Sequence, residues 1–146
     1  SYDVVLCTQV LEHALDPPRV ISELARVVGP GGRVLASTHG VQVYHPSPVD
    51  FWRWTHAGLE RLFTEHGDWK SVTVRPGAGT TACVGMVVAI YMDLLVRKRL
   101  HAARLSGAVA AGINRAAAAL DARSPDLRDP RPGALFANYH VVAVKA

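Results

Sequence analysis

The sequence Tyr-Asp-Val-Val-Leu-Cys-Thr-Gln-Val-Leu-Glu-His at residues 2–13 is the strongest indication of how this chain folds. It contains a continuous apolar run, Val4 to Leu6, which is typical of a strand buried on both faces of a parallel sheet. A second such run, Val34 to Ala36, comes after residues 17–28, where apolar residues recur at helical spacing. The order of strand, helix and strand predicts one βαβ unit with two parallel strands.

Polar side chains follow both predicted strands at the point where each strand ends. In open parallel sheets, ligands bind beyond the carboxyl ends of the strands. We therefore expect the chemistry of this chain to lie at Cys7, Thr8, Gln9, Thr38 and His39.

Residues 2–13, together with Glu-Leu-Ala-Arg-Val-Val-Gly-Pro-Gly-Gly-Arg-Val-Leu at 23–35, resemble the second half of a class I methyltransferase that uses S-adenosylmethionine. The resemblance extends over residues 2–75 and, more loosely, over the last strand. It implies an α/β fold with a partial Rossmann-like methyltransferase sheet. In that sheet, strands four to seven correspond to residues 2–7, 33–38, about 71–75 and 139–145.

Three parts of the resembled family are missing from these 146 residues. They are the glycine-rich loop after the first strand, the acidic residue that holds the ribose, and the strand that contacts adenine; no Gly-x-Gly-x-Gly occurs in the chain. We therefore expect the chain to represent only the carboxyl-terminal half of a methyltransferase domain. By itself it should bind the cofactor weakly or not at all, and its first strand should expose an unpaired apolar edge.

About sixty residues after Pro76 separate the last two predicted strands, where a minimal methyltransferase has a short hairpin. They predict a long helix that begins in the uncharged stretch 77–92 and an alanine-rich helix at 107–123. A charged loop is expected at 125–132. We predict a single partial domain over residues 1–146, with residues 77–124 as a helical insertion.

The apolar segment 82–96 invites a membrane interpretation. It is short for a membrane span and Asp93 interrupts it, but basic residues follow it. Attachment to a membrane surface through residues 82–104 therefore stays open. The alternative, which we favour slightly, is that the two inserted helices cover the acceptor site.

Composition limits the classes of partner. The formal net charge of +4 is modest, and the basic residues after position 96 are not interleaved with aromatic residues, so no nucleic-acid partner is predicted. The two cysteines, Cys7 and Cys83, lie in separate apolar runs, which argues against a structural disulfide and for a reducing, cytoplasmic compartment.

The resemblance implies that Cys7, Thr8, Gln9 and His13 lie beside the cofactor, S-adenosylmethionine. From the residues alone, Cys7 is better explained as a packed small side chain than as a nucleophile. Thr8 and Gln9 either hold the ligand or end the strand. Glu12 and His13 have the chemistry for acid–base catalysis, but a structural role in the turn before the helix is favoured.

The aromatic loop at 40–54 follows the second strand, in a region that helps to form the acceptor pocket of the resembled family. We predict His45 as the base, which is required only when the acceptor must lose a proton. His39 and His56 are the next candidates for the base. The residues predicted to bind the acceptor are His39, Tyr44, Trp52, Arg53 and Trp54, whose rings and guanidinium either hold a planar or anionic acceptor or pack the loop onto the sheet.

Histidines in this loop also suggest a metal site. His39, Tyr44 and His45 are close in sequence, but Asp50 is the one carboxylate near them. On this ground no metal site is predicted.

The function predicted from these residues is methyl transfer from S-adenosylmethionine to a small-molecule or lipid-linked acceptor. Positioning of donor and acceptor supplies much of the rate in such a reaction. The alternative is a non-enzymatic module, derived from half of a methyltransferase, that binds a partner chain or a membrane surface through its inserted helices.

Overall fold

The computed structural model describes residues 1–100 and 103–146. The chain forms two compact units. The first consists of residues 1–77 and 138–146, and the second of residues 78–137. The second unit contains most of the predicted insertion at 77–124 and continues beyond it.

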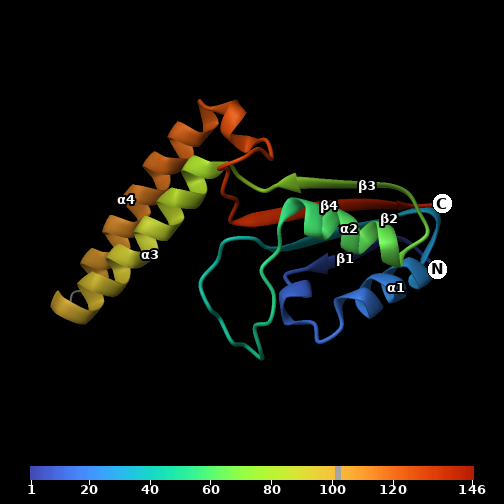
Figure 1. Cartoon of the computed structure of the whole chain (residues 1–146). Coiled ribbons are helices and arrows are strands. Elements are labelled where there is room, and N and C mark those ends of the chain that lie inside the picture. Colours follow the sequence, from blue (N-terminus) through green and yellow to red (C-terminus); the bar gives the residue numbers. More distant parts are fainter. Residues whose placement is uncertain (101–102) are drawn as a thin grey trace. The chain divides into compact units, whose positions relative to one another are not determined.

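A four-stranded sheet forms the centre of the first unit (Figure 1). Its strands, in spatial order, are β1 (Tyr2–Thr8), β2 (Val28–His39), β4 (Asn138–Lys145) and β3 (Trp69–Pro76). β1 pairs in parallel with β2, so that Val4 lies opposite Arg33. β4 runs antiparallel to both of its neighbours. The predicted α/β fold and the predicted parallel pairing of the first two strands are confirmed.

Two helices pack against one face of this sheet, α1 (Pro17–Val27) and α2 (His56–His66) (Figure 1). α1 begins where the Asp16 carboxylate accepts a hydrogen bond from the Arg19 backbone nitrogen at 3.1 Å. α2 begins where the Thr55 hydroxyl accepts one from the Gly58 nitrogen at 3.0 Å. The core between helices and sheet includes Ile21, Leu59, Phe63, Val34, Val141 and Ala143, all of which are fully buried.

The two faces of the sheet differ in exposure. Alternate residues such as Cys7 and Ala36 are buried on the helix-covered face, whereas Leu6 on the opposite face is 69% exposed. The expectation that the first strand is buried on both faces is therefore wrong: β1 lies at the edge of the sheet, and Cys7 alone of its seven residues is buried. The expectation of an exposed apolar edge strand is confirmed. Large apolar side chains exposed along this open face are Val4, Leu6, Leu35 and Val142.

The second unit consists mainly of two helices packed along each other, α3 (Thr80–Leu100) and α4 (Ala103–Ala122) (Figure 1). The helices come very close at Gly85, because a Cβ atom placed there would lie 2.2 Å from the Cβ atom of Ala117. α4 begins earlier than predicted. Part of the predicted charged loop forms a short 3-10 helix, η2 (Pro125–Arg128).

A buried carboxylate connects the elements of this second unit. Asp121 accepts hydrogen bonds from the backbone nitrogens of Gly79 at 3.0 Å and Ala82 at 3.2 Å, and from Arg128 Nε at 3.2 Å. The first N–H groups of a helix have no acceptor inside that helix. Asp121, at the end of α4, therefore supplies the acceptor that the beginning of α3 requires.

One face of α3 is apolar and exposed. We call it the α3 stripe; its residues are Val84, Val87, Val88, Tyr91 and Leu94, and they follow one another at helical spacing. Residues 80–97 form one stretch that is long and apolar enough to cross a membrane by length and composition, with 22% of it buried; this is the single such helix among the described residues. The predicted membrane-contacting segment 82–104 includes residues 101–102, which lie outside the described residues.

Candidate functional site

The ends of β1 and β2 carry the residues predicted to meet the cofactor. Cys7 is 5% exposed, which agrees with a packed side chain. Burial raises the pKa of the Cys7 thiol, and the nearby Glu12 carboxylate raises it further. The thiol is therefore held in its protonated, unreactive form.

Gln9 fastens the end of β1 to its neighbours. Its backbone has a positive φ of 55°, and its backbone nitrogen donates to the Ser37 carbonyl oxygen at 2.8 Å. Its side-chain nitrogen Nε2 donates to Ser37 Oγ at 3.0 Å and to Asn138 Oδ1 at 3.3 Å. The side chain thereby joins the ends of β1, β2 and β4. Thr8, next to it, is exposed and lines a hollow of about 350 Å³ on the open face of the sheet.

Glu12 is fully buried in the short 3-10 helix η1 (Leu11–His13), which follows β1. Its Oε2 accepts a hydrogen bond from the Thr38 hydroxyl at 2.7 Å. Its Oε1 has no hydrogen-bond partner among the described residues and lies 3.6 Å from His39 Nε2. The Glu12 backbone carbonyl accepts from the nitrogens of Phe51 and Trp52, which anchors the aromatic loop to η1.

His39 lies at the end of β2 beside this carboxylate. Its Nδ1 is buried without a hydrogen-bond partner among the described residues. Burial lowers the pKa of His39; the Glu12 carboxylate opposes that shift, and Arg53 and His45 add to it. The site therefore favours the neutral imidazole at His39.

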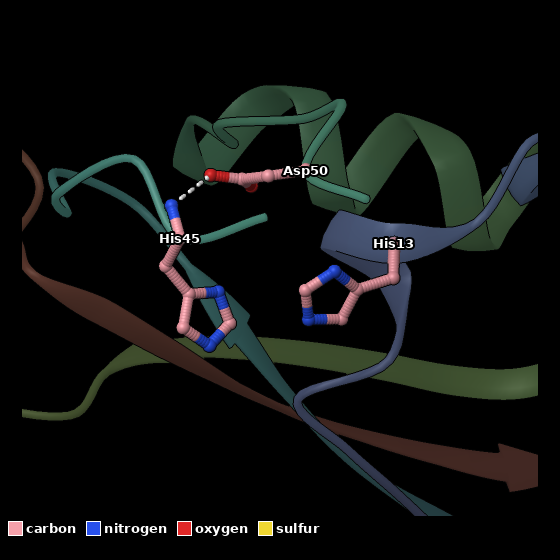
Figure 2. Close-up of side chains that lie close together, drawn as sticks. All are labelled: His13, His45 and Asp50. Carbon is pink, nitrogen blue, oxygen red and sulfur yellow. Dashed lines mark hydrogen bonds between the residues drawn. The ribbon is translucent and has the colours of Figure 1, made fainter. Parts of the chain in front are cut away.

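Three histidines from different elements meet at this end of the sheet. The ring centroid of His45, in the aromatic loop, lies 5.1 Å from that of His13 and 5.6 Å from that of His39. Figure 2 shows the rings of His13 and His45 side by side. The Nδ1 atom of His13 contacts the carbonyl oxygen of Val49. The structure thus brings together the residue predicted as the base and two residues predicted to meet ligands.

Arg53 and Asp50 shape the loop that carries His45. Arg53 donates from both terminal nitrogens to the two Asp50 oxygens, at 2.5 and 2.6 Å, and also to the backbone oxygens of Gln42, Val43 and Trp52. Asp50 in turn accepts from the His45 backbone nitrogen at 2.9 Å (Figure 2). The Arg53 guanidinium and the His45 N–H hold the pKa of the Asp50 carboxyl well below its usual range. The guanidinium predicted to bind the acceptor thus organises the loop.

The aromatic residues of the loop divide into two groups. The rings of Trp52 and Trp54 stack with centroids 5.6 Å apart, and Trp52 Nε1 donates to the Ala14 carbonyl oxygen at 2.7 Å. Tyr44 is 75% exposed. The stacked tryptophans are thereby joined to Ala14, which follows η1, whereas the Tyr44 side chain lies in solvent.

Comparisons with known proteins identify the first half of the chain. Residues 1–72 match a family described as "Methyltransferase domain". A stretch of 38 residues, 26% of the chain, is 54% identical to the ubiquinone biosynthesis O-methyltransferase of Aeromonas salmonicida and spans 16% of that protein's length. The corresponding enzyme of Vibrio cholerae is 53% identical over 38 residues, again 26% of this chain and 16% of that protein.

A solved structure reproduces the fold over 99% of the chain. It is phosphoethanolamine N-methyltransferase 2 of Haemonchus contortus in complex with S-adenosylmethionine, with a TM-score of 0.53 and 17% identity. The chain spans 33% of that protein, so the fold is shared with about one third of a larger enzyme. Residues 1–72, just under half of the chain, therefore match a methyltransferase domain, and the chain shares the fold of part of a structure solved with S-adenosylmethionine.

Proposed function

We propose that this chain forms the acceptor side of a methyltransferase site that transfers a methyl group from S-adenosylmethionine to a small-molecule acceptor. The observation that carries the proposal is the group of polar and aromatic side chains at the carboxyl ends of β1 and β2: His13, His39, His45, Trp52 and Trp54. In an α/β sheet this is the edge where ligands bind.

The end of β1 fits part of the cofactor. Cys7 is small and buried, and Thr8 presents an exposed side chain beside the hollow on the open face. Gln9 donates to Ser37 and Asn138, so we assign it the role of holding the strand ends that meet the cofactor. His13 would lie on the cofactor side of the histidine group. When bound, S-adenosylmethionine supplies an activated methyl group.

His45 is the proposed base. It is exposed, and its ring has no hydrogen-bond partner among the described residues, so it is free to accept a proton from an acceptor. His39, beside it, is buried, and its low pKa keeps it neutral. The stacked Trp52 and Trp54 offer a flat apolar surface for the acceptor. Arg53 contributes indirectly, because its hydrogen bond to Asp50 fixes the loop that carries these residues.

The test is methyl transfer by the complete protein that contains this chain. S-adenosylhomocysteine release is measured with phosphoethanolamine as a nitrogen acceptor and with a simple catechol as an oxygen acceptor. Replacement H45A should lower kcat by about 100-fold for an acceptor that loses a proton, and W52A should raise KM. H66A, on α2, is the matched control. Turnover that is unchanged in H45A and W52A would contradict the proposed roles.

The cofactor side gives a second test. Residues 1–146 contain no Gly-x-Gly-x-Gly, so we expect the chain alone to bind S-adenosylmethionine weakly or not at all. Isothermal titration that gave micromolar affinity for residues 1–146 would contradict this expectation.

We also propose, as a second function, that the chain works in the cytoplasm at a membrane surface, where a lipid-linked acceptor would be reached. The supporting observation is the exposed α3 stripe, with Tyr91 60% and Leu94 61% exposed, followed in the sequence by Arg97, Lys98 and Arg99. An apolar helix face next to basic residues suits the headgroup layer of an anionic membrane.

Vesicle sedimentation tests this second function. The wild-type chain should bind vesicles of phosphatidylglycerol and phosphatidylcholine, and the double variant V87S/L94S should lose at least about tenfold in affinity. Binding that stays the same in V87S/L94S, or none at all in the wild type, would contradict it. H45A and W52A should bind vesicles as the wild type does, which separates this function from catalysis.

A further inference from the structure

We propose that His13, His45 and Asp50 form a site for one divalent transition-metal ion of borderline softness, for which Zn²⁺ is the probe. One ligand atom of each residue lies within 4.8 Å of those of the other two (Figure 2). Two imidazole nitrogens and one carboxylate oxygen are a donor set that such ions prefer. The site goes beyond the proposed methyl transfer, in which His45 acts as the base only while no ion is bound, and beyond the sequence prediction, which included no metal.

The surroundings of His13 support its role as a ligand. Its Nδ1 contacts the Val49 carbonyl oxygen, and a carbonyl can only accept, so Nδ1 carries the proton. Nε2 is therefore the unprotonated nitrogen with a lone pair. Histidines that bind metals characteristically donate their other N–H to a backbone carbonyl or a carboxylate, which fixes the tautomer and the direction of the ring.

Asp50 is oriented in the same manner. Arg53 donates to both of its oxygens and the His45 backbone nitrogen donates to Oδ2, so the carboxylate is fixed in one direction and held ionised. Carboxylate ligands of metals are usually hydrogen-bonded in turn by such neighbours. The same hydrogen bond places the His45 backbone next to the carboxylate that would share the ion.

The charge near the three ligands also suits a cation. Glu12 and Asp50 are two carboxyl groups against one guanidinium, Arg53, and Glu12 Oε1 is buried without a hydrogen-bond partner among the described residues. Glu12 is connected to the three ligands by way of His39. Its Oε1 lies beside His39 Nε2, and the His39 ring contacts the His45 ring. A bound cation would offset this excess of negative charge.

Small side-chain rotations would complete the site. Ligand atoms around a tetrahedral zinc ion lie about 3.4 Å apart, given bond lengths of about 2.1 Å. The present separations of up to 4.8 Å thus require a shift of roughly 1 Å. His45 is exposed in a loop, and rotation of its side chain provides that shift. Three protein ligands leave a fourth position open to water or to a ligand.

The experiment is equilibrium binding of Zn²⁺ to the chain, with H45A as the first variant and H66A as the matched control. His45 is exposed and its ring makes no described hydrogen bond, so H45A should keep the fold, which circular dichroism checks. The wild type and H66A should bind one Zn²⁺ at micromolar concentration, and H45A should bind at least about tenfold more weakly. H13A and D50N should show the same loss.

Co²⁺ gives an independent readout that does not depend on turnover. Visible absorption bands of four- or five-coordinate Co²⁺ should appear with the wild type and H66A and disappear with H45A. The proposal is overturned by the absence of saturable Zn²⁺ binding below about 1 mM, or by H45A binding as tightly as the wild type. It is equally overturned if H66A loses as much affinity as H45A. Methyl transfer is not measured, so failure here leaves the proposed function standing.

Discussion

Glu12 and Asp121 are both buried carboxylates, and their surroundings differ. Asp121, in the helical unit, receives three hydrogen bonds, from Gly79, Ala82 and Arg128. Glu12, in the sheet unit, receives one side-chain hydrogen bond, from Thr38, and its Oε1 has no described hydrogen-bond partner.

This difference separates a structural carboxylate from one available for function. Burial of a carboxylate costs free energy unless hydrogen bonds replace those of water. At Asp121, hydrogen bonds from the protein fully replace those of water and fix the beginning of α3, so this residue stabilises the fold. At Glu12 it is incomplete, and incompletely satisfied buried groups concentrate at functional sites. Four predictions test this difference, in order of decreasing effect.

The isosteric change D121N should have the largest effect on stability. Its amide NH₂ would face N–H donors that now meet a carboxylate oxygen, so the free energy of unfolding should fall by about 3 kcal/mol. Urea denaturation followed by helical circular dichroism measures it. The matched change D129N, at an exposed position, should stay within about 0.5 kcal/mol of the wild type. Equal midpoints for D121N and D129N would show that Asp121 has no structural role.

The corresponding change at the other carboxylate, E12Q, should lower the free energy of unfolding by about 1 kcal/mol or less. The amide oxygen of glutamine still accepts from the Thr38 hydroxyl, and its NH₂ takes the place of the oxygen that has no described partner. The same urea titration compares it with D121N. A loss as large as that of D121N would make Glu12 a second structural carboxylate and remove the contrast.

The pH dependence of stability should report His39, next to Glu12. Unfolded histidine binds a proton near pH 6.5, whereas burial lowers the folded pKa of His39, so the unfolded state gains the proton first as the pH falls. The contribution of His39 to the free energy of unfolding is therefore complete above pH 6.5 and is lost as the pH falls from there through the folded pKa.

Urea midpoints at several values between pH 7.5 and 5.5, with a chelator present, measure this loss. The variant H39Q should flatten the slope, and H66A should keep it. A slope that is the same in H39Q and in the wild type would assign the pH dependence to other groups.

The smallest effect is expected at Cys7. Burial is the larger cause of its raised pKa and the Glu12 carboxylate the smaller, so E12Q should speed alkylation of Cys7 by iodoacetamide by less than about threefold. Cys83 is an internal control, because burial alone raises its pKa. Mass spectrometry of the two cysteine peptides gives both rates. An equal acceleration of Cys83 would indicate a general loosening of the fold.

Local sequence signals predicted the elements of the fold well. The apolar runs of β1 and β2 and the helical spacing over residues 17–28 are local signals, and each lies where the structure has the corresponding element. Exposure of β1 was harder to predict. A continuous apolar run indicates a strand buried on both faces, but it does not reveal which neighbours the strand has, and β1 has one.

The sequence predicted many of the residues of the candidate site, but not which of them contact one another. The Glu12 and His13 pair and the aromatic loop were recognised from their sequence. That Arg53 would bind Asp50, and that His13 would meet His45, depends on how the loop folds back onto η1 through the Glu12 carbonyl. Nothing in the sequence near Asp121 predicts its role, because Asp121 accepts hydrogen bonds from the beginning of a helix that starts about forty residues earlier.

The close approach of α3 and α4 at Gly85 has a consequence for how this sequence can diverge. With a Cβ at position 85 only 2.2 Å from that of Ala117, no other residue fits at 85 while alanine occupies 117. The exchange of glycine and alanine between the two positions restores the fit. Natural variants of this helical pair should therefore change these two positions together, as a compensating pair, rather than one at a time.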